Sequence, residues 1–129
     1  MQLNDIFNNK NKKFLYIKLM DNSILIDFLK ILKENNRWYS IQELTNLLNI
    51  KEINLIKLIK KEKYNDINRK NLAYFKILEF KKDGNSLKTL YIKYNSTIYD
   101  EIIDSCIKRN DLLKDNKWVE KWKTPTIWD

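Results

Sequence analysis

The side chains best able to do chemistry in this sequence are lysines and arginines, and the chemistry open to them is the neutralisation of phosphate. Residues 51–72 carry seven basic and three acidic groups, and residues 73–94 carry five and two. These two segments therefore hold +7 of the net charge of +8. Basic side chains that neutralise phosphates release counterions from a nucleic acid, so an anionic partner is expected.

Other side chains that support catalysis or metal binding are scarce. The chain has no histidine and a single glycine, Gly84, which excludes the phosphate-binding and dinucleotide-binding loops that need several glycines. Asp and Glu are scattered along predicted helices rather than gathered in a cation-binding cluster. The single cysteine, Cys106, fits a reducing compartment and is expected to be a small buried residue. We predict a protein that is not an enzyme and that needs no metal or cofactor.

The chain length of 129 residues suits one hydrophobic core. No apolar run approaches the roughly 18 residues of a membrane helix. The N-terminal residues MQLNDIFNNKNKK lack the continuous apolar core of a signal peptide. We therefore predict a cytoplasmic protein that does not associate with a membrane.

The segment WYSIQELTNLLNIKEINLIKLIKK, residues 38–61, begins with strong signals for a helix start. Ser40 is a good N-cap, and Glu43, three residues later, can complete a capping box. Tyr39 and Leu44 are spaced to form a hydrophobic staple across this cap. A short helix is therefore predicted directly after Ser40.

A second helix is predicted to follow after a tight turn. Leu44, Leu47 and Leu48 form the apolar side of the first helix, Asn49 interrupts the pattern, and the next helix begins near Lys51. Two short helices joined in this way, the second one basic, have the layout of a helix-turn-helix.

These residues resemble a known family. SIQELTNLLNI, preceded by NNRWY and followed by a helix and IKK, is similar to the helix-turn-helix of Mga-type and DeoR-type winged-helix transcription regulators. The resemblance covers Leu25 to about Lys63, and it implies a winged-helix fold whose second helix contacts DNA. The sequence departs from the family pattern in two ways. Lys51 replaces an N-cap serine, and Ile53 and Ile56 replace exposed polar or basic residues.

A β-hairpin is predicted after the two helices and a polar connector. Two runs rich in aromatic and β-branched residues, LAYFKILEF and LKTLYIKY, flank Asp83-Gly84. Both of these residues tolerate positive φ, which favours a tight hairpin turn. A hairpin in this position is what a wing would look like.

The remaining segments are expected to flank this region. KFLYIKLM, residues 13–20, could be a strand or the lead-in to a helix over residues 24–34. A C-terminal helix is expected from Ser96, interrupted at Asn110-Asp111. Apolar residues at helical spacing form a stripe on this predicted helix. Two tryptophans lie one helical turn apart in the sequence that follows the helix. The stripe and the pair are Ile98, Ile102, Ile103, Cys106, Ile107, Trp118 and Trp122.

Together these elements predict an α+β fold. It is a winged helix-turn-helix with a three-helix core and a β-hairpin wing, followed by an additional C-terminal helix. The predicted organisation is an N-terminal arm or short strand at residues 1–22, the winged helix-turn-helix domain at 23–94, and a helical extension with a Trp-rich tail at 95–129.

The resemblance places DNA contacts on the exposed face of the second helix, and the charge distribution extends them to the connector and the hairpin. Asn54 could pair with adenine, and Lys57 could reach guanine or a phosphate. A basic hairpin tip suits the narrow minor groove of A-tracts, so double-stranded and AT-rich DNA is the expected partner. For any one lysine, simple solvation is the alternative. The candidate DNA-binding residues are Lys51, Asn54, Lys57, Lys60, Lys61, Arg69, Lys70, Lys81, Lys82, Asn85 and Lys88.

The function expected from these features is that of a small dimeric transcription regulator that binds preferred DNA sequences. A homodimer is expected because such modules usually pair to read two half-sites, and because an exposed Ile53 and Ile56 would need covering by the C-terminal segment or a second subunit. One alternative is an accessory factor in replication or conjugative transfer of a mobile genetic element. Another is a winged helix that binds a protein and no nucleic acid.

Overall fold

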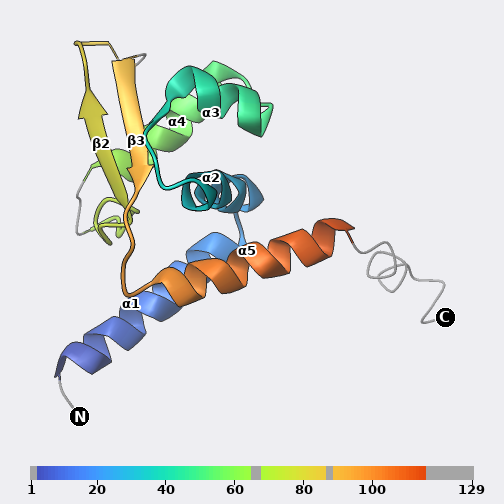
Figure 1. Ribbon diagram of the computed structural model, residues 1–129. Coiled ribbons are helices and arrows are strands. Elements are labelled where there is room, and N and C mark those ends of the chain that lie inside the picture. Colours follow the sequence, from blue (N-terminus) through green and yellow to red (C-terminus); the bar gives the residue numbers. More distant parts are fainter. Residues whose placement is uncertain (1–2, 65–67, 87–88, 116–129) are drawn as a thin grey trace. The chain divides into compact units, whose positions relative to one another are not determined.

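The computed structural model describes residues 3–64, 68–86 and 89–115 (Figure 1). These residues confirm the α+β class, with α-helices and one small antiparallel sheet. In chain order the elements are α1 (Leu3–Met20), α2 (Ser23–Glu34), β1 (Tyr39–Ser40), α3 (Ile41–Leu48), α4 (Glu52–Lys63), β2 (Leu78–Lys82), β3 (Leu90–Tyr94) and α5 (Asp100–Asp115).

The elements divide between two compact units. Residues 27–100 form one unit, which holds most of α2, the sheet, α3 and α4. The described residues of 1–26 and 101–129 form the other, which holds α1, the start of α2 and nearly all of α5.

The N-terminal segment is a helix, so the predicted arm or short strand is wrong for the described residues. The aromatic and β-branched residues of KFLYIKLM suggested a strand. However, Leu15 and Leu19 lie one helical turn apart and are both fully buried. Burial of one helix face overrides the local strand preference.

The predicted helix over residues 24–34 is confirmed as α2. The side-chain oxygen of Asn22 accepts a hydrogen bond from the Leu25 N–H at 3.1 Å and caps its first turn. The apolar residues Phe28, Leu29 and Leu32 are completely buried. α2 therefore supplies a large part of the core of the 27–100 unit.

The predicted pair of helices after Trp38 is also confirmed. The Glu43 N–H donates to the Ser40 hydroxyl at 3.1 Å, and the Ser40 N–H donates to the Glu43 carboxylate at 3.2 Å, which completes the capping box. Asn49 ends α3 in the left-handed conformation, with φ 53° and ψ 47°. Lys51 then occupies the N-cap of α4 without a side-chain hydrogen bond to the first turn. Leu47, predicted on the apolar side of α3, is instead 56% exposed.

The strands pair in the order β1-β3-β2, with Tyr39 opposite Ile92 and Lys82 opposite Leu90. This confirms the predicted hairpin, but its first strand is shorter than the run LAYFKILEF. Residues 72–76 form turns, and Lys76 adopts a positive φ of 59° before β2 begins. In Figure 1, β2 and β3 lie beside α3 and α4.

The hairpin loop differs from the tight Asp-Gly turn that was predicted. Gly84 does not take a positive φ, and the last paired residues are Lys82 and Leu90. The Asp83 N–H donates to the Thr89 carbonyl at 3.2 Å, and the Thr89 hydroxyl donates to the Ser86 carbonyl at 2.6 Å. These bonds close a wider loop, which removes the need for positive φ at Gly84.

Two buried polar side chains, Glu62 and Asn71, connect the end of α4 to the segment that leads into β2, and we call them the Glu62–Asn71 clasp. The two side chains are only 6% and 1% exposed. A Glu62 carboxylate oxygen accepts from the Leu72 N–H at 3.2 Å. The Asn71 amide donates to the Lys61 carbonyl at 3.2 Å, and its oxygen accepts from the Tyr74 N–H at 2.9 Å. The clasp therefore fixes where the chain leaves α4 and turns towards the hairpin.

The C-terminal helix begins later than predicted and continues past Asn110-Asp111. It starts at Asp100 rather than near Ser96, because the Thr97 hydroxyl accepts from the Tyr99 N–H at 3.1 Å. The predicted interruption at Asn110-Asp111 is wrong, since α5 continues through it to Asp115. The tryptophan pair of the predicted tail lies outside the described residues.

The predicted apolar stripe of α5 is buried in part. Ile103 and Cys106 are buried, which confirms Cys106 as a small core residue, whereas Ile98 precedes the helix and is exposed. Burial raises the pKa of the Cys106 thiol, and the nearby charge of Arg109 opposes this rise. The Arg109 guanidinium contacts the sulfur of Met20 at the end of α1.

Replacing Asn71 with alanine should destabilise the protein by about 1–3 kcal/mol, because buried backbone groups lose their hydrogen-bond partners. Urea unfolding followed by circular dichroism measures this change. The exposed Asn85 is the matched control, and Asn85→Ala should stay within about 0.5 kcal/mol of the wild type. Equal effects of the two substitutions would contradict the role assigned to the clasp.

Candidate nucleic-acid interface

The exposed side of α4 carries most of the predicted contact residues. Lys57, Lys60 and Lys61 are exposed there, and none of them forms an ion pair within the described part of the chain. Leu55 and Ile59, on the opposite side, are buried and anchor the helix. One face of α4 is thus fixed in the core, and the other presents uncompensated positive charge. Lys51 and Asn54, at the N-terminal end of the helix, are exposed as well.

Ile53 lies within this charged face. Its side chain is 59% exposed, as predicted, and it precedes Lys57 by one helical turn. Ile56 is only half-buried and Leu58 is similar, so the second predicted exposed isoleucine is partly covered. Among the apolar side chains of α4, Ile53 is therefore the most exposed, and it lies among lysines.

The last turn of α4 comes close to the hairpin. Burial lowers the pKa of Lys63, and the neighbouring ammonium group of Lys82 lowers it further. Two like charges from α4 and from the end of β2 are thus held together. An anion that binds between them would relieve this repulsion.

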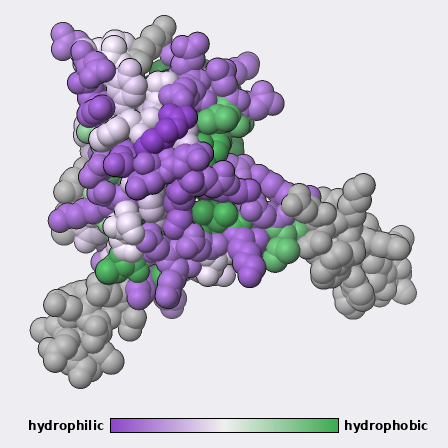
Figure 2. Space-filling view, in the orientation of Figure 1, coloured by the Kyte–Doolittle hydropathy of each residue, from purple (hydrophilic) through white to green (hydrophobic). Residues whose placement is uncertain are grey.

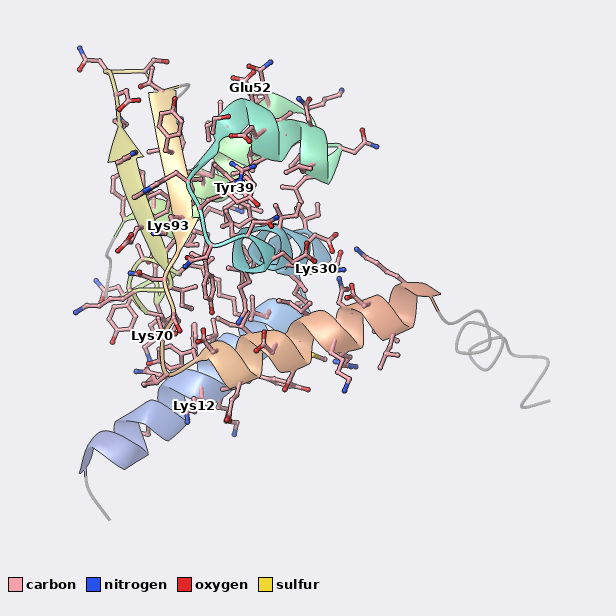
Figure 3. The ribbon with its side chains drawn as sticks, viewed as in Figure 1. Lys12, Lys30, Tyr39, Glu52, Lys70 and Lys93 are labelled. Carbon is pink, nitrogen blue, oxygen red and sulfur yellow. The ribbon has the colours of Figure 1, made fainter. Side chains whose placement is uncertain are left out.

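The predicted contact residues of the hairpin and of the connector differ in exposure. Lys81, Lys82 and Asn85 are exposed at or near the loop, whereas Lys88 lies outside the described residues. Arg69 is exposed and Lys70 half-buried. Figure 3 shows Lys70 near the start of β2, at the end of the hairpin opposite the loop. The structure therefore does not bring Lys70 to the hairpin tip.

The outer face of the sheet carries three residues that sequence reasoning missed, and they surround the predicted contact residue Lys81. They are Trp38, Tyr91 and Lys93. The ring of Trp38 has the Lys81 ammonium 4.6 Å and the Lys93 ammonium 6.0 Å from its centroid. Lys81 also lies 5.7 Å from the ring centre of Tyr91. The alternation of Leu90, Ile92 and Tyr94 with the intervening residues could have revealed this face, because successive strand residues point to opposite sides.

Figure 2 shows the visible surface of the 27–100 unit as mostly hydrophilic, with an apolar area where α3 meets α2. Leu47, Leu48 and Ile31 line an open pocket of about 270 Å³ there, together with Asp27, Lys30 and Glu34. This pocket is the main exposed apolar feature of α3, and it lies apart from the lysines of α4.

A second polar cluster surrounds Asp100. Its carboxylate accepts hydrogen bonds from the Tyr94 hydroxyl and from the Ser96 hydroxyl, the latter at 2.6 Å, and lies 3.7 Å from the Lys33 ammonium. Burial alone would raise the pKa of Asp100. The hydrogen bonds from Ser96, Tyr94 and Thr97 and the charge of Lys33 instead hold it below its ordinary value of 3.8. The cluster lines an open cavity of about 510 Å³ and ties the end of β3 to α2.

Other kinds of site do not stand out in the described part of the chain. Among these residues, no group of His, Cys, Asp and Glu side chains could hold a metal ion, and no helix is long and apolar enough to span a membrane. The chain matches no protein-family model, no curated protein and no solved structure.

The Asp100 cluster should make stability fall in acid. Because the pKa of Asp100 is lowered by folding, its stabilising effect is present above the ordinary value of 3.8 and is lost as the pH falls through the lower folded pKa. Asp100→Asn should therefore lower the urea midpoint at neutral pH and show a smaller further loss in acid. Asp83→Asn, in the exposed hairpin loop, is the control with the same charge change. An unchanged acid dependence in Asp100→Asn would contradict this prediction.

Proposed function

We propose that the 27–100 unit is a winged helix that binds double-stranded DNA, with α4 in the major groove and the hairpin as its wing. The observation that supports this most is the exposed lysine face of α4, whose charges have no carboxylate partners in the described part of the chain. The order of elements from α2 to β3 is also the order implied by the sequence resemblance.

The expected role of each residue of α4 in DNA binding follows from its side-chain chemistry. Lys57, Lys60 and Lys61 would hold phosphates, which fixes register without reading sequence. Asn54 can pair with adenine, and Ile53 can contact the methyl group of thymine. A lone isoleucine among lysines suits such a contact, whereas a dimer built on this face would force like charges together. This argues for AT-containing sites and against dimerisation through α4.

Lys63 and Lys82 would share a phosphate at the place where helix and hairpin converge. Because their ammonium groups repel each other in the free protein, an anion between them gains more than it would at an isolated lysine. The wing would thus bind the backbone next to the groove that α4 enters. A transcription regulator is the simplest role for such a module.

A homodimer is proposed to form through the other unit. Phe14 and Ile17 are 41% and 54% exposed and lie three residues apart on α1, so they are on the same helix face. Two large exposed apolar side chains on consecutive turns favour contact with a second copy. A pair of DNA-binding units could then read two half-sites.

Changing Lys57, Lys60 and Lys61 to alanine should weaken duplex binding steeply at low salt. The slope of log affinity against log salt should fall by about 0.9 for each phosphate that the variant no longer neutralises. Fluorescence anisotropy with AT-rich and GC-rich duplexes at several salt concentrations measures both effects. The matched control removes the same charge from the other unit, at Lys10, Lys13 and Lys108, all of which are exposed. Similar weakening in the two variants would mean that net charge alone drives binding.

Replacing Phe14 and Ile17 with glutamine should convert a dimer into a monomer, because the apolar contact is removed while the net charge is unchanged. Sedimentation velocity over a range of protein concentrations measures the mass. Ile53→Gln, at another exposed isoleucine, should leave the mass as in the wild type. A monomeric wild-type protein, or a dimer that dissociates only in Ile53→Gln, would refute dimerisation through α1.

A further inference from the structure

The outer face of the sheet carries a small basic and aromatic patch, which we call the Trp38 patch and define as Trp38, Lys81, Tyr91 and Lys93. Leu90, Ile92 and Tyr94 are buried, so Tyr91 and Lys93 between them face outward. Lys81 is the direct cross-strand partner of Tyr91. Figure 3 shows Lys93 over the sheet and Tyr39, whose side chain is buried, on the side of α3 and α4.

The cations of this patch are available to a ligand. Lys81 and Lys93 contact the aromatic rings, and neither forms an ion pair in the described part of the chain. Arg37, next to Trp38 in sequence, differs from them because its guanidinium lies 2.8 Å from the Glu43 carboxylate. Trp38 and Tyr91 are each half-buried, so part of each ring remains accessible.

The chemistry of the patch suits an unpaired base with its phosphate. A base stacked on an aromatic ring raises affinity by a factor of about 5 to 150, whereas an exposed cation–π contact contributes a factor of about 2 to 5. A base can therefore displace one lysine from the Trp38 ring with a net gain. The displaced ammonium group remains close enough to pair with the adjoining phosphate.

A duplex cannot use the patch in this way, because its bases are stacked on one another and present only their edges. We infer that the Trp38 patch binds single-stranded DNA, with bases stacked on Trp38 and Tyr91 and phosphates held by Lys81 and Lys93. This inference goes beyond the duplex binding proposed above and does not depend on it.

The two proposed surfaces meet at adjacent residues of one strand. Lys81 faces Trp38 on the outer side of β2, and Lys82 lies close to Lys63 of α4. A DNA molecule that is duplex on one side and unpaired on the other would engage both surfaces. If both the duplex binding and the single-strand binding hold, the hairpin binds at a junction between duplex and single-stranded DNA. Such a junction favours a role in replication or transfer over simple repression.

The test uses the full chain and a fluorescein-labelled thymidine oligonucleotide of about 12 nucleotides, within the range of site sizes of single-strand binders. Wild-type protein should bind it, and Tyr91→Thr should weaken binding at least fivefold. Combined replacement of Lys81 and Lys93 by glutamine should do the same. Both changes lie on the exposed face of the sheet, so the fold should persist and circular dichroism should be unchanged. Trp38→Phe keeps a ring and should lose less affinity than Trp38→Leu.

A spectroscopic readout reports stacking directly. With Trp118, Trp122 and Trp128 changed to phenylalanine, Trp38 is the sole tryptophan. Its fluorescence should be quenched by the oligonucleotide with the same midpoint as the anisotropy change. Unchanged fluorescence at saturation would overturn the inference, since the bases would then lie elsewhere.

The α4 variant separates this inference from the proposed duplex binding. Changing Lys57, Lys60 and Lys61 to alanine should reduce duplex affinity and leave oligonucleotide affinity within about twofold. If the α4 variant lost affinity for both duplex and oligonucleotide, and the variants of the Trp38 patch kept both affinities, one surface would bind both forms of DNA. That result would overturn the inference. Failure to bind a duplex, with oligonucleotide binding retained, would refute the proposed function alone.

Discussion

The Glu62–Asn71 clasp is the contact on which the arrangement of the 27–100 unit depends. Both side chains are buried, and together they satisfy backbone groups at the end of α4 and at the start of the segment before β2. A buried polar group without a hydrogen-bond partner lowers the stability of the fold. A path of the chain after α4 that broke these hydrogen bonds would therefore be less stable. The angle at which the basic helix meets the hairpin is thereby set by two polar residues rather than by apolar packing alone.

The pleat of the hairpin then divides its charges between two surfaces. Alternate residues of β3 are buried, so the residues between them face outward, and Lys81 follows the same rule on β2. Lys82, one residue later, is close to α4. Lys81 and Lys82 are adjacent in sequence but lie in different environments. Lys81 is beside an aromatic ring, and Lys82 is beside another ammonium group. A one-residue change of register would exchange them.

The sequence predicted the structure correctly where a local pattern, such as a helix cap, agreed with the burial of the residues around it. The capping box at Ser40 and Glu43, the helix end at Asn49 and the helix over residues 24–34 were all predicted correctly, because each depends on residues close together in the chain. For the segment KFLYIKLM the sequence left a strand and a helical lead-in open, and the strand is excluded because burial of Leu15 and Leu19 favours a helix. Asp83-Gly84 was misread because Thr89 closes a wider loop by hydrogen bonds that no local pattern reveals. The role of Trp38 was not predicted, since its lysine neighbours come from β2 and β3.

The closeness of Lys63 and Lys82 links folding to anion binding. The nearby ammonium group of Lys82 adds to the effect of burial in lowering the pKa of Lys63. Because linkage is reciprocal, an anion that binds between the two lysines would oppose this shift and stabilise the fold that brings them together. The hydrogen bonds of the Glu62–Asn71 clasp lie at the same end of α4 as Lys63. An uncharged partner, by contrast, would not relieve the repulsion between the two ammonium groups.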